Sequence, residues 1–290
     1  MRKEFKAFST LIIYSYIAYS VLYLYPFLFG HSYDKANPSD VVQINIFLDI
    51  LLFIITVLLS IDILRGFKKV SNDKNKKEIV EFLKALLKSI IGFIAVKYVL
   101  GIIVGLISII LGIDQTSVNQ QALETLFKLA PFAMFVTGAF LAPVTEELVF
   151  RGAIKRIIKN KRVFITVSGL IFGLVHIFKY NLPIFVILIA GYLIDMIVTS
   201  EMKKRHKVDL IICTLIVLLT VLGISMQTIT GNLMGVIVDF QLSELVNGIM
   251  YVGVGCYFAY IYYKYDNIYI NILVHVFNNL LAYIVLFTLL

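Results

Sequence analysis

The sequence has little charge and almost no cysteine. Asp, Glu, Lys and Arg make up 15% of its 290 residues, whereas hydrophobic residues make up 60%. Soluble domains contain about 25% charged and about 45–50% apolar residues, and much of any folded surface must face water. The apolar excess cannot be buried in one soluble core of this length. The composition therefore excludes soluble enzymes and disordered chains, and it predicts a polytopic membrane protein.

The two cysteines and several missing motifs exclude further classes. Cys213 and Cys256 lie in apolar stretches and form no CxxC pair, so we interpret them as small buried hydrophobic residues and not as a disulfide framework. The sequence has no His-Glu-x-x-His, Gly-x-Ser-Gly or Gly-x-Gly-Asp motif and no phosphate-binding glycine loop. These absences exclude zinc-helix proteases and the serine and aspartyl types of intramembrane protease.

Long apolar runs predict an all-α transmembrane bundle of about nine spans, with eight or ten also compatible. The predicted spans are residues 9–30, 44–64, 90–112, 123–142, 163–178, 182–200, 210–228, 245–263 and 268–290. The first run lacks a small-residue cleavage site, so it is expected to be a retained span and not a signal peptide. Residues 78–89 are expected to form an amphipathic surface helix that runs into the third span. The fourth span is expected to reach Ala142, with a kink at Pro143, and residues 145–162 are expected to continue as a strongly basic helix.

The net charge of +8 is carried by short basic segments between the apolar runs. These segments are residues 1–8, 65–77, 151–162 and 201–207, together with Lys264. Cytoplasmic loops of membrane proteins have an excess of Lys and Arg, so we assign all five to the cytoplasm. The protein is thus expected to be a multi-pass protein of the cell membrane with a cytoplasmic N-terminus. Because the basic residues follow the loops, the lipid bilayer is an expected partner and nucleic acid is not.

A charge inside a membrane span costs about 2.5–3.5 kcal/mol, and nine ionisable residues are therefore considered as candidates for function. They are Asp49, Asp62, Lys97, Glu146, Glu147, His176, Asp195, Asp239 and His275. Asp62, Lys97 and Asp239 lie near span ends, where a side chain can reach the headgroups. Asp49 and Asp195 can hydrogen-bond between helices. The remaining four are the candidates for function.

Two glutamates and an arginine share one helix in the segment EELVFR, residues 146–151. Glu147 and Arg151 are four residues apart and face each other on a helix, so we expect an ion pair. Glu146 lies about 100° round the helix and is left as the candidate general base. An ordinary charged helix end would contain the same residues.

Two of the four histidines lie deep in predicted spans, and each has a partner one helical turn away. Phe172 precedes His176 by four residues, and Asn279 follows His275 by four. Either pair alone is typical of a hydrogen bond between helices. At 1.5 Å per residue, His275, His176 and Glu146 lie about 10, 21 and 14 Å from the ends of their helices, so with tilt they can converge.

Together these side chains supply a base, an acid and an oxyanion donor. This set suits water-mediated hydrolysis of a peptide bond. A carboxylate and two imidazoles, here Glu146, His176 and His275, could equally hold zinc with an open fourth position. Gly169 and Gly173 on the His176 helix would let a neighbouring backbone approach closely.

Three motifs, in this order, resemble the signatures of the CPBP family, the CAAX-protease and bacteriocin-processing intramembrane proteases also called Abi proteins. The motifs are Glu146-Glu147-x-x-x-Arg151, Phe172-x-x-x-His176 and His275-x-x-x-Asn279. The C-terminal residues are also similar to the last helical hairpin of the family, so the resemblance covers residues 123–178 and 245–290. It implies a catalytic transmembrane core in residues 123–290, after N-terminal helices and the surface helix in residues 1–122. An insertion at about 183–243 departs from the compact core expected of the family.

The resemblance implies a role for each motif residue. The roles are water activation by Glu146 and His176, support from Glu147 and Arg151, shaping of the cavity by Phe172, and oxyanion stabilisation by His275 and Asn279. Family names include "metalloprotease", yet the prenyl-protein endopeptidases that this chain resembles are also described as metal-independent glutamate enzymes. We prefer the metal-free interpretation and keep zinc as the alternative.

The sequence thus predicts an intramembrane endopeptidase whose cavity opens to the cytoplasmic side. The expected substrate is a peptide or a membrane-associated protein, since bacterial members of the family are linked to bacteriocin or pheromone processing and to self-immunity. One alternative is a non-catalytic membrane scaffold or immunity protein that regulates an envelope enzyme. Another is a transporter or channel in which Glu and His relay protons.

Overall fold

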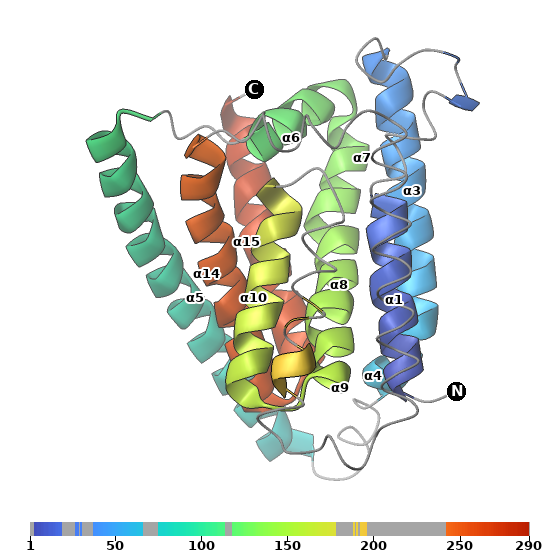
Figure 1. Cartoon of the computed structure of the whole chain (residues 1–290), viewed down its shortest axis with the longest axis vertical. Coiled ribbons are helices and arrows are strands. Elements are labelled where there is room, and N and C mark those ends of the chain that lie inside the picture. The colour runs from blue at the N-terminus through green and yellow to red at the C-terminus, as the bar shows by residue number, and fades with distance from the viewer. Residues whose placement is uncertain are drawn as a thin grey trace. The chain divides into compact units, whose positions relative to one another are not determined.

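The computed structural model (Figure 1) describes residues 3–18, 27–28, 30, 37–65, 75–113, 118–177, 188, 190, 192–195 and 242–289. Every secondary-structure element among these residues is a helix, which confirms the all-α prediction. Within the described ranges, five helices are long and apolar enough to cross a membrane: Pro38–Leu59, Glu78–Leu111, Pro131–Ile157, Ser243–Tyr265 and Ile268–Thr288. Residues 210–228 and most of 182–200 lie outside the described part of the chain, so the count of nine spans stays a prediction.

The chain divides into two compact units. The first unit comprises Met1–Ile94, Asn119–Ala153 and Ile261–Leu290, and the second comprises Ala95–Val118 and Ile154–Tyr260. Helices that lie wholly in the first unit include α1 (Lys3–Ala18), α3 (Pro38–Leu59), α4 (Ile61–Leu64) and α15 (Ile268–Leu289). The second unit contains α10 (Lys161–Ile177), and α5 (Asn75–Leu111), α6 (Val118–Leu129) and α14 (Leu242–Tyr265) contain residues of both.

A continuous run of helix, here called the rod, spans Pro131–Ile157. It is built from α7 (Pro131–Val136), the π-helix η3 (Thr137–Leu141), α8 (Ala142–Glu146), the π-helix η4 (Glu147–Ala153) and α9 (Ile154–Ile157). The helix continues past Ala142, as predicted, but the predicted start of this span at residue 123 is wrong. The chain instead breaks at Ala130, whose φ of −146° and ψ of 66° are not helical. Pro131 then starts the rod at a position where a helix needs no N–H donor.

Pro143 lies inside the rod without ending it. A proline ring clashes with the carbonyl four residues earlier in an α-helix, and it has no N–H to donate. In η3 the backbone widens, because the N–H of Ala142 donates to the carbonyl of Thr137, five residues back. The wider turn makes room for the proline ring, so Pro143, which was expected to kink the helix, is accommodated in a π turn.

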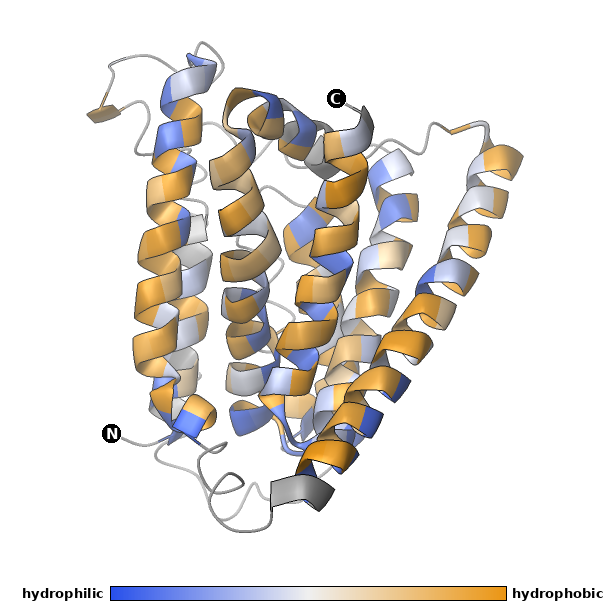
Figure 2. Cartoon of the chain, turned by 180° about the vertical axis from the view of Figure 1, so that it is seen from behind, coloured by the Kyte–Doolittle hydropathy of each residue, from blue (hydrophilic) through white to orange (hydrophobic). Residues whose placement is uncertain are grey.

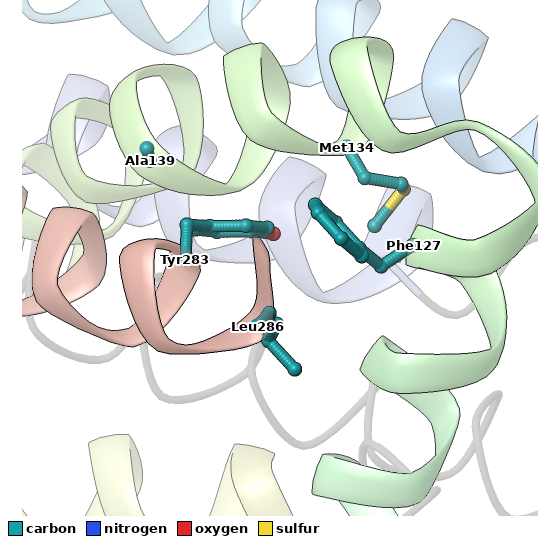
Figure 3. Close-up of a cluster of buried hydrophobic side chains, with 5 residues drawn as sticks. All are labelled: Phe127, Met134, Ala139, Tyr283 and Leu286. Atoms are coloured by element: carbon teal, nitrogen blue, oxygen red, sulfur yellow. The ribbon is translucent and has the colours of Figure 1, made fainter. Parts of the chain in front are cut away.

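The first unit packs three helices around the rod. Helix α15 runs antiparallel to it: Tyr283 contacts Phe135, nearer the start of the rod, and His275 contacts Glu147 further along. Helices α1 and α3 lie side by side (Figure 1) and also pack on the rod. A hydrophobic cluster joins α6, the rod and α15 (Figure 3). Its members are Phe127, Met134, Ala139, Tyr283 and Leu286.

Large apolar side chains remain exposed along the long helices. On α3 these include Phe47 and Leu58, and on α5 they include Ile109 and Ile110, each more than 60% exposed. Figure 2 shows hydrophobic residues along the length of these helices. Apolar surface of this extent needs a bilayer around it. The protein is accordingly a multi-pass membrane protein.

In the second unit, α10 and α14 meet through glycine. A Cβ atom on Gly169 would lie 2.8 Å from the backbone nitrogen of Cys256, and one on Gly173 would lie 2.8 Å from that of Val252. Only glycine permits an approach this close. The Gly169-x-x-x-Gly173 spacing therefore does bring a neighbouring backbone close, as predicted.

Candidate active site

Glu147 is fully buried, and three side chains surround its carboxylate. Arg151 Nη1 lies 3.1 Å from Oε1, His275 Nδ1 lies 2.9 Å from the same oxygen, and Asn271 Nδ2 donates to Oε2 across 3.1 Å. The expected ion pair with Arg151 is thus present. Because both carboxylate oxygens have donors, the buried charge is compensated. Glu147 is an anchor that fixes His275, and it does not line the cavity described below.

His275 stands between two glutamates. The carboxylate of Glu147 can only accept a hydrogen bond, so Nδ1 of His275 carries a hydrogen. Nε2 is therefore directed at Glu146, whose Oε2 lies 3.8 Å away. That distance exceeds a hydrogen bond, but hydrogen bonds of catalytic groups often shorten only when substrate binds. The convergence predicted for Glu146 and His275 is found in the first unit.

Glu146 lines a cavity of about 100 Å³. The opposite wall comes from α1 and α3, and the full lining is Tyr14, Ile17, Asn45, Leu48, Asp49, Leu52, Ala142, Thr145 and Glu146. Water occupies about 30 Å³ per molecule in the liquid, so the cavity has room for a few water molecules beside a carboxylate. A candidate general base, a cavity with both polar and apolar walls, and an oriented imidazole are thus assembled within one unit.

Asp49 brings a second carboxylate to this cavity, where it interacts electrostatically with Glu146. The sequence suggested only a hydrogen bond between helices for Asp49, so its position beside the candidate base was missed. A signal was present, because Asn45 and Asp49 are four residues apart in an apolar helix and therefore share a face. Nothing in the sequence showed that this face meets Glu146.

Asn271 was missed as well, although α15 carries its own signal. Asn271, His275, Asn279 and Tyr283 recur at every fourth position of an otherwise apolar helix, which places them in one stripe. The structure directs this stripe at the rod. Each of the four contacts a residue of the rod or lies against its backbone.

Asn279 is bound to the backbone of the rod. Its Nδ2 donates to the carbonyl oxygen of Gly138 across 2.8 Å, and its Oδ1 accepts from Asn278 Nδ2 across 2.9 Å. One N–H of the amide is thereby committed to the helix that carries Glu146. The role of Asn279 as an oxyanion donor stays a prediction.

Phe172 and His176 lie on α10 in the second unit. His176 Nδ1 donates to the carbonyl of Phe172 across 2.6 Å, because a carbonyl can only accept. Nε2 of the neutral ring is therefore an acceptor. The ring stacks on Tyr251, with centroids 4.8 Å apart and planes 16° apart. The two units are described separately, so the predicted action of His176 on Glu146 stays a prediction.

Asp195 has a structural place in the second unit. Its carboxylate accepts hydrogen bonds from the backbone N–H groups of Lys159 and Asn160, at 2.6–3.1 Å. These groups lie just before α10, and Asn160 Oδ1 in turn accepts from the N–H groups of Arg162 and Val163. Asp195 thus fixes the start of α10, consistent with the expected hydrogen bonding between segments.

A zinc site was the alternative use of Glu146, His176 and His275. Among the residues that the structure describes, no three His, Cys, Asp or Glu side chains are grouped so that they could hold a metal ion. In the first unit, Glu146 and His275 supply two donor groups, whereas a catalytic zinc takes three protein ligands. The third predicted ligand belongs to the second unit, so the zinc set stays a prediction and no step below depends on it.

Comparison with known proteins adds a family to this geometry. The sequence profile of the family described as "Type II CAAX prenyl endopeptidase Rce1-like" matches residues 128–281, just over half of the chain. That range includes the whole rod, α10, α14 and α15 as far as Leu281. It does not include α1 or α3, which form the opposite wall of the cavity.

Individual relatives are similar over shorter stretches. The protein named "Putative membrane peptidase YdiL" of Bacillus subtilis (strain 168) is 26% identical over 181 residues, which cover 61% of this chain and 72% of that protein. The "UPF0177 protein YvdC" of Lactococcus lactis subsp. lactis (strain IL1403) is 37% identical over 92 residues, which cover 31% of this chain and 35% of that protein. No solved structure gives a significant match.

Proposed function

Because the chain belongs to the Rce1-like family of type II CAAX prenyl endopeptidases, we propose that it is an intramembrane endopeptidase that hydrolyses a peptide bond with water activated by Glu146. The family assignment makes it a membrane protein of the CAAX-protease type. The reaction, its residues and its substrate are the proposal. One observation carries it: Glu146 lines a cavity and faces an imidazole that a second glutamate holds in place.

In the proposed reaction, the carboxylate of Glu146 takes a proton from a water molecule in the cavity. The water oxygen forms a bond to the carbonyl carbon of the substrate, and the carbonyl oxygen becomes an oxyanion. The Nε2–H of protonated His275 then donates to that oxyanion, while Glu147 holds Nδ1. The C–N bond breaks, and the proton on Glu146 passes to the leaving amine.

Glu146 and Glu147 have different proposed roles because their surroundings differ. Glu147 is fully buried, pairs with Arg151 and hydrogen-bonds to His275 and Asn271, so it cannot leave its position to move a proton. The side chain of Glu146 is 16% exposed and borders the cavity. His176, with Nε2 as an acceptor, suits the role of a second group that orients the water, as the family resemblance implies.

The proposed substrate is a peptide or a membrane-associated protein. The cavity is small and lies between the membrane-spanning helix α3 and the membrane-spanning rod, so the scissile bond must reach it as an extended segment with little bulk. The relatives include a protein named as a membrane peptidase. Processing of a bacteriocin or pheromone precursor is the biological use we favour, with zinc kept as an alternative cofactor.

The test compares cleaved termini in cells that carry wild type or Glu146→Gln at equal protein levels, by terminal-peptide mass spectrometry of secreted and membrane peptides. Glutamine keeps the shape of the side chain and removes the base. We expect a defined set of termini to disappear, with a rate loss on the order of 10³-fold or more. The matched control is Glu81→Gln, which makes the same change at a side chain that is 62% exposed, and it should keep every terminus.

Contrary outcomes are equally defined. If Glu146→Gln and the null strain give the same termini as wild type, the protein is not a protease. If Glu146→Gln also rescues the phenotype of the null strain, a non-catalytic scaffold or immunity protein becomes the leading hypothesis.

A further inference from the structure

Pro143 leaves one carbonyl of the rod without its helical donor. In η3 the N–H of Ala142 donates to Thr137, five residues back. If the following residue continued this pattern, its N–H would donate to the carbonyl of Gly138. That residue is Pro143, which has no N–H. Asn279 Nδ2 donates to that carbonyl, 2.8 Å away. A side chain of α15 thus supplies the hydrogen bond that the proline cannot make.

The same π turn sets the direction of Glu146. Residues eight apart in an α-helix differ by about 80° around the axis, but one extra residue in a turn reduces the difference to about 20°. Gly138 faces α15, since Asn279 and Tyr283 lie against it. Glu146, eight residues later, therefore returns to nearly the same face. It is found there, 3.8 Å from His275 of α15.

We propose that Asn279 is a positioning residue: by holding the carbonyl of Gly138 it locks the π turn η3, and the locked turn aims Glu146 at His275. The inference rests on the proposed function and replaces the oxyanion role that the family resemblance implies for Asn279. The hydrogen bond from Asn278 to Oδ1 of Asn279 fixes the amide with Nδ2 toward Gly138. Asn279 acts on catalysis through the backbone of the rod.

A double-mutant cycle of Asn279→Ala and Pro143→Ala tests this role. Pro143→Ala restores a backbone N–H at position 143. If the turn keeps its π pattern, this N–H can donate to the carbonyl of Gly138. If the turn relaxes to an α pattern, the N–H of Ala142 can donate to that carbonyl. In the wild-type background, Asn279→Ala leaves that carbonyl unsatisfied. We expect the unfolding midpoint in detergent to fall by roughly 2–8 °C and cleavage to fall on the order of 10²-fold.

In the background of Pro143→Ala, the same Asn279→Ala change should lower the midpoint by less than half as much. Its effect on cleavage should also be at least about tenfold smaller, because the bond it removes is no longer needed. A merely destabilising substitution would not show this dependence on Pro143. Midpoints are read as the folded fraction that survives heating, by size-exclusion chromatography.

Asn160→Ala is the matched control. Asn160 Oδ1 accepts from the N–H groups of Arg162 and Val163 at the start of α10, so its loss removes a helix cap and lowers the midpoint. Pro143→Ala should not rescue this variant. A rescue of Asn160→Ala would show that Pro143→Ala stabilises the protein in general, and it would remove the support for a specific coupling.

Other results overturn the inference. If Asn279→Ala lowers cleavage by the same factor with or without Pro143 and leaves the midpoint unchanged, Asn279 is an oxyanion donor. If Pro143→Ala alone abolishes cleavage, only the unfolding midpoints can test the cycle. Shifts of the midpoint that are strictly additive would then contradict a coupling between Asn279 and Pro143. If wild type cleaves nothing, the proposed function fails, while the midpoint cycle still tests the link between Asn279 and Pro143.

Discussion

Two antiparallel helix pairs in this chain meet in different ways. In the second unit, α10 and α14 approach through Gly169 and Gly173, whose missing side chains let the backbone of α14 come close. In the first unit, α15 meets the rod through charged and amide side chains gathered around Glu147. Both pairs are long apolar helices, so the difference lies in a few residues and not in the overall composition.

The contrast separates packing from chemistry. Helix α10 packs on α14 through glycine contacts and ring contacts such as His176 on Tyr251, so buried charge is not a general requirement for packing two helices here. Charged groups within a membrane are costly and are kept where function uses them. We interpret the glycine contacts as scaffold, and the cluster around Glu147 as the support of a reacting group.

Removing a charged partner from the cluster around Glu147 should have the largest effect on folding. Arg151→Met leaves the carboxylate of Glu147 buried without its guanidinium partner, and breaking a buried pair in this way costs about 3–5 kcal/mol. We expect little folded protein in detergent, measured by size-exclusion chromatography after mild heating. Arg162→Met, the same change at an exposed arginine, should remain folded.

A double variant sharpens this prediction. Replacing both partners, as Glu147→Leu with Arg151→Met, removes the unpaired charge and should recover much of the folded protein. Cleavage should stay absent, because Nδ1 of His275 loses the carboxylate that holds it. Recovery of cleavage together with folding would show that Glu147 contributes to stability alone.

Replacing a glycine by alanine should have the next largest effect on stability, and the sign of the effect should differ between Gly173 and Gly101. A Cβ on Gly173 would lie 2.8 Å from the backbone nitrogen of Val252, so Gly173→Ala should overpack the contact and cost about 1–3 kcal/mol. A Cβ on Gly101 would meet only Met250 at 3.7 Å. Gly101→Ala should therefore be neutral or stabilise the helix by up to about 1 kcal/mol. Equal losses at both positions would contradict the proposed close contact.

Much of the fold follows from apolar runs and capping residues. The last two spans were predicted at 245–263 and 268–290, and the helices are Leu242–Tyr265 and Ile268–Leu289. The start of α3 was placed six residues late, because the cap formed by Asn37, whose Oδ1 accepts from the N–H of Ser39, was overlooked. Hydropathy finds the middle of a span more reliably than its ends.

Only part of the site could be predicted from the sequence, because some of its contacts join different helices. Spacing by four residues gave the Glu147–Arg151 pair and could have given Asn271 with His275, since both rules act within one helix. The partnership of Glu147 with His275 joins residues 128 positions apart and depends on how two helices are rotated. The π turn at η3 controls that rotation, and a proline inside a helix is compatible with either a kink or a π turn.

The smallest predicted effect concerns the wall of the cavity that the family match does not include. Leu48 lines the cavity from α3, so Leu48→Phe should narrow it beside Glu146. We expect cleavage to persist with a several-fold loss that falls mainly on substrates with bulky residues next to the scissile bond. The terminal-peptide profile should therefore shift toward small residues at that position.

Leu58→Phe, the same change on the same helix, is the matched control because Leu58 is 62% exposed on the apolar surface. It should leave the profile as in wild type. If both variants shift the profile equally, or if neither does, the wall formed by α1 and α3 does not select the substrate. A shift confined to Leu48→Phe would mean that residues 128–281 supply the reacting groups, while the N-terminal helices determine which peptides reach them.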